Sequence, residues 1–135
     1  MTKVILFGTH PKQYNGYSKV IYELARNIVK HKDIDLTIYG FQCFNNAQNK
    51  HREDVSGYTI YDAHKEEGEL KTQGFGIHEI KKKVSEIKPD VCIIYNDLLV
   101  ISSVIKQLIE VKHENMKIVA YVDQVYLSQK KEYIN

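Results

Sequence analysis

The chain has 135 residues, of which 43% are hydrophobic and 27% charged, and its formal net charge at pH 7 is +2. This length is one domain's worth and can bury a core without disulfides or metal ions, while the composition excludes a disordered chain and a coiled coil. The small charge calls for no nucleic-acid partner. No apolar run reaches the roughly 20 residues of a membrane span, and the N-terminus is too short for a signal peptide, so we expect a cytoplasmic protein.

The first forty residues predict a strand, a loop, a helix and a second strand. The first strand is Lys3–Gly8, the helix begins at Tyr17 after a polar loop, and the second strand is Leu36–Gly40. This order is typical of two parallel strands joined by a crossover helix, with a first turn that faces a ligand. The unit therefore favours a ligand-binding cleft.

Polar loops and a short strand follow this unit. Residues 41–57 carry no apolar period and predict a long surface loop, Tyr58–Tyr61 predicts a third strand, and residues 63–74 predict a second loop. Apolar residues at helical spacing then predict a helix over Ile77–Ile87. Pro89 ends this helix, because the residue before a proline disfavours the helical conformation.

The last part of the chain continues the alternation. Val91–Tyr95 is a continuous apolar run, which is typical of a central strand buried on both faces. An apolar stripe over Ile101–Ile109 predicts a further helix, with Asp97 as its N-cap. Ile118–Val122 predicts a fifth strand, and residues 126–135 predict a terminal helix or a linker.

Strands that alternate with helices in this way predict an α/β fold. We expect one Rossmann-like domain over residues 1–125, built on a doubly wound parallel sheet with helices on both faces. In such sheets ligands bind at the carboxyl ends of the strands, near the point where the strand order reverses. The loops that follow the five strands should therefore lie along one edge.

Five residues near the expected strand ends are candidates for contact with a ligand. His10 suits hydrogen bonding or proton transfer near neutral pH, and it also fits an ordinary loop histidine. Gly16 lets a phosphate or a sugar approach the backbone amides at the start of a helix, or it simply eases a turn. Tyr17 suits stacking on a sugar ring or packing, Asp97 suits a ligand contact or a helix cap, and Asp123 suits orientation of a hydroxyl nucleophile or a turn.

Two common nucleotide-binding motifs are missing from the first turn. Between Gly8 and Gly16 there is neither a G-x-G-x-x-G pattern nor a P-loop, which argues against an NAD enzyme and an NTPase. The cysteines, Cys43 and Cys92, are isolated, so the sequence predicts neither a disulfide nor a metal site. Cys92 lies in an apolar strand, where a thiol behaves as a small hydrophobe.

Several segments, taken in order, resemble the N-terminal half of a GT-B glycosyltransferase of the retaining family four. The resemblance lies in the opening strand, in Asn15-Gly16 where the family has a glycine pair, and in the run Glu23-Leu24-Ala25 of the first helix. It continues in Lys88-Pro89-Asp90 before an apolar strand and in residues 117–123. Together these segments span nearly the whole chain.

The resemblance implies an enzyme of two Rossmann-like domains, of which this chain is the acceptor-side domain. A C-terminal donor domain would bind most of the nucleotide sugar, and this chain alone would be inactive. Gly16 would approach the donor diphosphate. The loop from His10 to Tyr17, which includes Asn15, would line the acceptor side together with Asp123, and Asp123 would be catalytic. Transfer to a carbohydrate, lipid or protein acceptor would need no metal or other cofactor, because electrostatic groups stabilise the departing diphosphate.

A different class of function remains open beside this one. The chain also fits a free-standing Rossmann-like binding module that partners a separate catalytic subunit. The lysine run Lys81–Lys83 fits a solvated helix face, or a weak contact with an anionic membrane surface, as a lipid acceptor would require.

Overall fold

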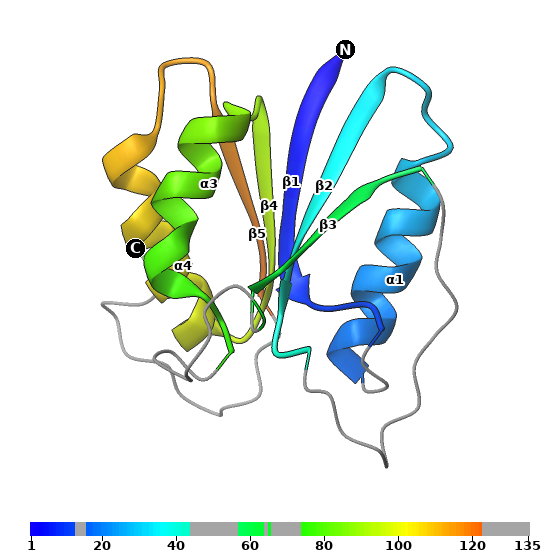
Figure 1. Cartoon of the computed structure of the whole chain (residues 1–135), viewed down its shortest axis with the longest axis horizontal. Helices are drawn as coiled ribbons and strands as arrows, with labels where there is room; N and C mark the ends of the chain where they lie inside the picture. The colour runs from blue at the N-terminus through cyan, green and yellow to red at the C-terminus, as the bar shows by residue number, and fades with distance from the viewer. Residues whose placement is uncertain (13–15, 44–56, 64, 66–73, 123–135) are drawn as a thin grey trace.

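The computed structural model describes residues 1–12, 16–43, 57–63, 65 and 74–122. In this part of the chain a single sheet has the strand order β3-β2-β1-β4-β5, and every neighbouring pair of strands is parallel (Figure 1). The strands are β1 (Thr2–Thr9), β2 (Ile34–Phe41), β3 (Thr59–Asp62), β4 (Val91–Asn96) and β5 (Lys117–Val122). The helices are α1 (Gly16–Ile28), the 3-10 turn η1 (Ile77–Glu79), α3 (Ile80–Ile87) and α4 (Leu98–Val111). The predicted doubly wound, Rossmann-like α/β fold is therefore confirmed.

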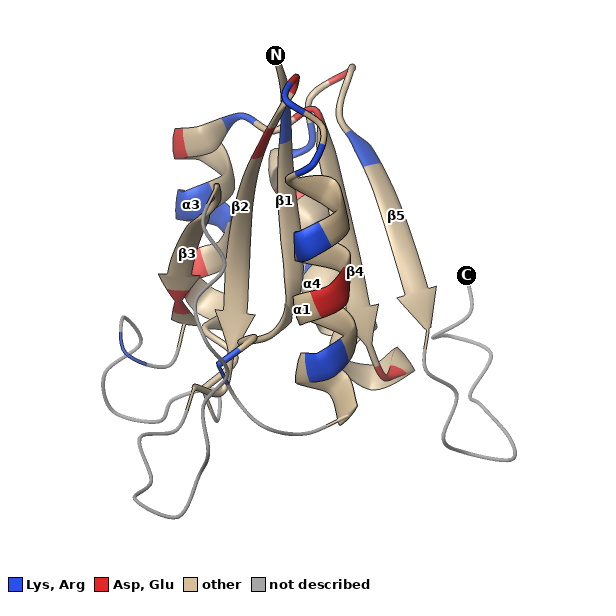
Figure 2. Ribbon diagram, turned by 90° about the vertical axis from the view of Figure 1, so that its right-hand side faces the viewer, with Lys and Arg blue, Asp and Glu red and all other residues tan. Residues whose placement is uncertain are grey.

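Helices cover both faces of the sheet, with α1 on one side and α3 and α4 on the other (Figures 1 and 2). Side chains of β1 alternate between the two layers, because successive residues of a strand point to opposite faces. Val4 and Leu6 pack with α1, whereas Ile5 and Phe7 pack with α3 and α4, and all four are buried. The apolar run that opens the sequence therefore contributes to the hydrophobic core on each face of the sheet.

A close contact at Gly8 fixes α1 against the sheet. A Cβ atom at this position would lie 2.2 Å from Cδ1 of Ile21, which is fully buried on α1. The helix can approach β1 this closely only because residue 8 has no side chain. The start of α1 is therefore held beside the carboxyl end of β1.

Two loop predictions are wrong at their first residues. Phe41 is the last residue of β2 and is fully buried, with its ring 5.2 Å from that of Phe75. Ala63 and Lys65 are helical, because Oδ1 of Asp62 accepts a hydrogen bond from the Lys65 amide at 3.0 Å, as an N-cap does. Most of the rest of the two predicted loops, at 44–56, 64 and 66–73, lies outside the described residues, as does the predicted terminal segment 126–135.

The amino ends of the strands are joined by hydrogen bonds around Asp90. The Lys3 amide donates to Asp90 Oδ2 at 2.8 Å, and the Asp90 amide donates to the Lys3 carbonyl oxygen at 2.8 Å. The Lys117 amide donates to the Asp90 carbonyl oxygen at 2.9 Å. One residue therefore links the starts of β1, β4 and β5.

Among the helices of the described residues, none is long and apolar enough to cross a membrane.

Candidate functional site

At the carboxyl ends of β1 and β4, the chain leaves the sheet toward opposite faces. After β1 the chain passes to α1 on one face, and after β4 it passes to α4 on the other face. These two strands are neighbours, so their loops diverge at the point where the strand order reverses. Parallel α/β sheets hold their ligands in a crevice at such a point.

The start of α1 is open at this edge of the sheet. Gly16 is exposed, and a Cβ atom on it would have no neighbouring atom within 4 Å. The first turn of α1 carries no acidic residue. The positive end of the helix dipole is therefore not offset by a carboxylate of its own first turn, which suits an anionic ligand.

Three tyrosines form a row that leads from this helix start across the sheet. The ring centre of Tyr17 lies 5.7 Å from that of Tyr95 on β4, and the Tyr95 and Tyr121 ring centres are 4.8 Å apart. Tyr95 and Tyr121 face each other in the register of β4 and β5. Tyr95 is buried, Tyr17 half-buried and Tyr121 57% exposed, so the row ends at the surface. We call it the tyrosine row.

Asp97 caps α4, as its position in the sequence predicts. Its backbone is extended, with φ −71° and ψ 165°, and its Oδ1 accepts a hydrogen bond from the Val100 amide at 2.9 Å. The side chain of Asn96 in turn accepts a hydrogen bond from the Asp97 amide at 2.9 Å. The cap is thus confirmed, and a contact of Asp97 with a ligand stays a prediction.

His10 is buried rather than displayed on a loop, with 4% of its surface exposed. Its amide donates to the Phe41 carbonyl oxygen at 2.9 Å, and its Nδ1 accepts a hydrogen bond from the Lys12 amide at 3.1 Å. Its ring lies against Gly40, where a Cβ atom would be only 2.7 Å from His10 Cδ2. The histidine is therefore packed onto the end of β2.

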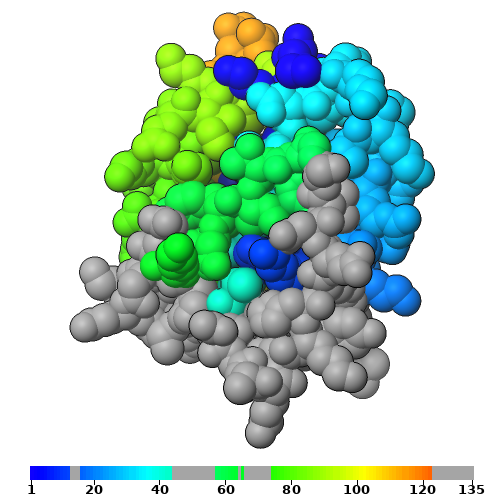
Figure 3. Space-filling view, turned by 45° about the vertical axis from the view of Figure 1, so that its right-hand side comes forward, coloured from blue at the N-terminus to red at the C-terminus, as the bar shows by residue number. Residues whose placement is uncertain are grey.

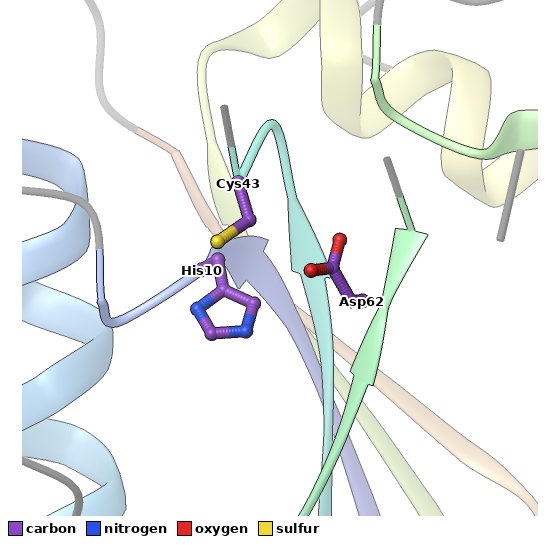
Figure 4. A group of neighbouring side chains, drawn as sticks. All are labelled: His10, Cys43 and Asp62. Atoms are coloured by element: carbon purple, nitrogen blue, oxygen red, sulfur yellow. The ribbon is translucent and has the colours of Figure 1, made fainter. Parts of the chain in front are cut away.

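The structure brings His10 together with Cys43 and Asp62, as Figure 4 shows. One side-chain nitrogen, sulfur or oxygen atom of each residue lies within 4.8 Å of the others. His10 follows β1, Cys43 follows β2 and Asp62 ends β3, so the group spans three neighbouring strands. Figure 3 shows the chain just after β1 (blue) and just after β2 (cyan) close together at the surface, beside the green region that includes β3. We call these residues the His-Cys-Asp group.

Sequence reasoning missed this group. Cys43 fell in a predicted surface loop, and two isolated cysteines gave no reason to expect a ligand cluster. Gly40, which is paired with Asp62 in the sheet and leaves room for the His10 ring, points to the group only once the strand register is known.

Of the other predicted residues, Asn15 and Asp123 lie outside the described part of the chain, so their roles stay predictions. Cys92 is fully buried, and burial raises the pKa of its thiol to about 12. Its sulfur lies 3.8 Å from that of Met116. Cys92 therefore behaves as the small apolar residue that the sequence predicts.

Two lysines of α3, Lys81 and Lys83, are engaged with neighbouring side chains. Lys81 pairs with Glu110 of α4, and Lys83 lies 3.6 Å from a carboxylate oxygen of Glu86. The Lys83 ammonium is also 4.7 Å from the ring centre of Tyr61. These contacts reduce the positive potential of the α3 face, and a membrane contact there remains a prediction.

The strand order and the helices on both faces define a Rossmann-like parallel α/β domain. No protein-family model matches the sequence, and no curated protein matches it. Among solved structures, the chain is similar to the enzyme WbmH of Bordetella bronchiseptica, determined in complex with NAD+, with a TM-score of 0.44 and 13% sequence identity. The similarity covers 82% of this chain and 36% of that one, so the chain spans little more than a third of the protein it matches. The fold assignment itself rests on the strand order.

Proposed function

We propose that the chain is the acceptor-side domain of a glycosyltransferase that uses a nucleotide sugar as donor. The observation that carries the proposal is the open start of α1 beside the tyrosine row. A helix start attracts phosphate groups, and exposed aromatic rings offer apolar faces to sugar rings. A sugar diphosphate presents both kinds of group to one site.

Each part of the crevice has a role in this proposal. The α1 amides behind Gly16 stabilise the negative charge of the departing diphosphate, because hydrogen-bond donors fixed in advance act without reorganisation. Tyr17 and Tyr121 contact the sugar or the acceptor. Asn15 contacts the acceptor, and Asp123 orients the acceptor hydroxyl. His10 accepts a hydrogen bond from the Lys12 amide and so fixes the chain just after β1.

Ligand-observed NMR on the chain tests the proposal with a UDP-sugar, a GDP-sugar, a free oligosaccharide and NAD+. We expect saturation transfer to a nucleotide sugar or to the oligosaccharide. Gly16→Trp should weaken this binding at least about tenfold, because the indole fills the open space while the fold stays intact. Lys19→Trp, one turn further along the exposed face of α1, is the matched control and should bind normally. Binding of NAD+ alone would contradict the proposal, and so would equal effects of the two tryptophans.

The tyrosine row is tested separately. Tyr121→Ala removes the exposed ring at the end of the row, and we expect it to weaken sugar binding without a change in thermal stability. Tyr22→Ala is the control, since Tyr22 lies on α1 near Arg26 and outside the row. If sugar binding is insensitive to Tyr121→Ala, the row has no part in it.

A second candidate function is supported by the exposed side of β5. Val119 is 51% exposed, Tyr121 57% and Val122 40%, and Figure 2 shows no described helix in front of β5 on the α1 side. Exposed apolar side chains on an edge strand favour a protein interface. We therefore keep the binding module that partners a separate subunit as the alternative. A Val119→Lys variant that alters assembly, in a chain that binds no sugar, would favour this alternative.

A further inference from the structure

The His-Cys-Asp group lies at the ends of β1, β2 and β3, whereas Tyr95 and Tyr121 of the tyrosine row lie on β4 and β5, on the other side of β1. Nothing in the proposed sugar transfer uses the thiol of Cys43 or the carboxylate of Asp62. The group therefore calls for its own explanation, which does not depend on the proposed function.

The local structure aims the three side chains at one place. Gly40 pairs with Asp62 across β2 and β3, and the His10 ring occupies the space that a larger residue at position 40 would take. Cys43 follows Phe41, whose carbonyl oxygen holds the His10 amide. His10 is buried, while Cys43 and Asp62 are half-buried, so the group is fixed on one side and open on the other.

We propose that His10, Cys43 and Asp62 bind a single divalent transition-metal ion of the zinc type. An imidazole nitrogen, a thiolate and a carboxylate are the donors that Zn²⁺ takes in proteins, whereas Mg²⁺ and Ca²⁺ prefer oxygen atoms alone. Three protein ligands leave a fourth tetrahedral position for water or a substrate atom. The donor atoms, now within 4.8 Å of one another, need to approach by about 1 Å to reach tetrahedral separations.

Metal binding changes the protons of two ligands. The Cys43 thiol loses its proton to solvent as the metal–sulfur bond forms. His10 Nδ1 accepts a hydrogen bond from the Lys12 amide in the metal-free structure. If Nε2 binds the ion, the ring proton moves to Nδ1, which can then no longer accept that hydrogen bond. If Nδ1 binds the ion, the ion takes the place of the Lys12 amide. Either route releases the Lys12 amide. Asp62 can ligate through one oxygen and keep its bond to Lys65 through the other.

Cobalt titration of the whole chain tests this inference. The protein is freed of metal with a chelator, kept reduced, and titrated with Co²⁺ while its absorbance is recorded. We expect one ion per chain, a thiolate-to-cobalt charge-transfer band, loss of the band when Zn²⁺ is added, and a shift of the Lys12 amide resonance. Absence of the band at saturating Co²⁺ would overturn the proposal.

Near-isosteric variants identify the ligands. Cys43→Ser should abolish the band, and Asp62→Asn should weaken binding at least about tenfold. Asp35→Asn, at an exposed position near the amino end of β2, is the control and should bind as the parent does. Cys92 stays in every variant as an internal control, because its buried thiol is protonated. Cobalt binding that survives Cys43→Ser, or that falls equally in Asp35→Asn, would assign the ion to other surface groups and overturn the proposal.

Discussion

The two edges of the sheet use their polar groups differently. At the amino edge, Asp90 bonds to the amides of Lys3 and Lys117 and to the carbonyl oxygen of Lys3, so its polar atoms hold strands together. At the carboxyl edge, His10 and Asp62 keep ring and carboxylate atoms near a thiol. The polar groups of the amino edge therefore hold neighbouring strands together, whereas the carboxyl edge brings reactive side chains close to one another.

The openness of the two edges differs as well. The turns at the amino edge are closed by short backbone hydrogen bonds, as from the Thr2 amide to the Asp33 carbonyl oxygen at 2.8 Å. The carboxyl edge presents the start of α1 at Gly16, where an added Cβ atom would meet no other atom within 4 Å. Substitutions at Gly16 should therefore change binding without a loss of stability, unlike substitutions at the amino edge.

The largest expected effect separates the two cysteines, one at the carboxyl edge and one in the core. Burial raises the pKa of Cys92 to about 12, so near pH 8 only about one thiol in ten thousand is ionised. Cys43 is half-buried and should react with a thiol reagent in the metal-free folded protein, whereas Cys92 should react only on unfolding. Mass spectrometry over time measures both rates, and Cys43→Ser should leave no fast phase. Equal rates for the two thiols would contradict this contrast.

Next in size is the effect of filling the space at Gly8. Gly8→Val places a branched side chain against buried Ile21 and should lower the free energy of unfolding by about 3 kcal/mol. Gly16→Ala, in the same loop-helix unit, meets open space and should change it by less than about 0.5 kcal/mol. Urea unfolding measures both. Similar losses at the two glycines would show that α1 does not rest on β1 as described.

The smallest effect concerns Asp97, where the cap and a ligand contact can be told apart. Asp97→Ala should lower the free energy of unfolding by about 1 kcal/mol, because the Val100 amide loses its partner. Asp97→Asn keeps an oxygen in place and should be nearly neutral for stability. If Asp97→Asn nevertheless weakens sugar binding, the carboxylate contacts the ligand as well. Equal stability loss in both variants would contradict the cap.

Much of the fold could be predicted because apolar periodicity is a local property of the chain. The predicted strands and helices agree with the observed ones within a few residues, and the Asp97 cap follows from its position before an apolar stripe. Phe41 was missed because its contact with Phe75 joins segments far apart in sequence. The exposure of β5 was missed for a related reason, since an apolar run reads the same whether or not a helix covers it.

The candidate site was predictable only where it depends on one segment. Gly16 and Tyr17 stand at the start of the first helix, close to where the sequence predicts it, and their part in binding stays a prediction. The His-Cys-Asp group depends on the register of three strands and on the missing side chain at Gly40, and neither can be read from local sequence. A site whose residues are brought together by strand register can be recognised only once the structure is known.

The most direct test is a titration of the isotope-labelled chain with the nucleotide sugar or oligosaccharide that binds it best, followed by amide NMR shifts. We expect shifts at the carboxyl edge, at residues 8–10, 16–18 and 96–98. The amides of Lys3, Asp90 and Lys117 should stay unchanged. Shifts centred on the amino edge, or no shifts with any nucleotide sugar or oligosaccharide, would contradict the claim that the carboxyl edge is the binding surface.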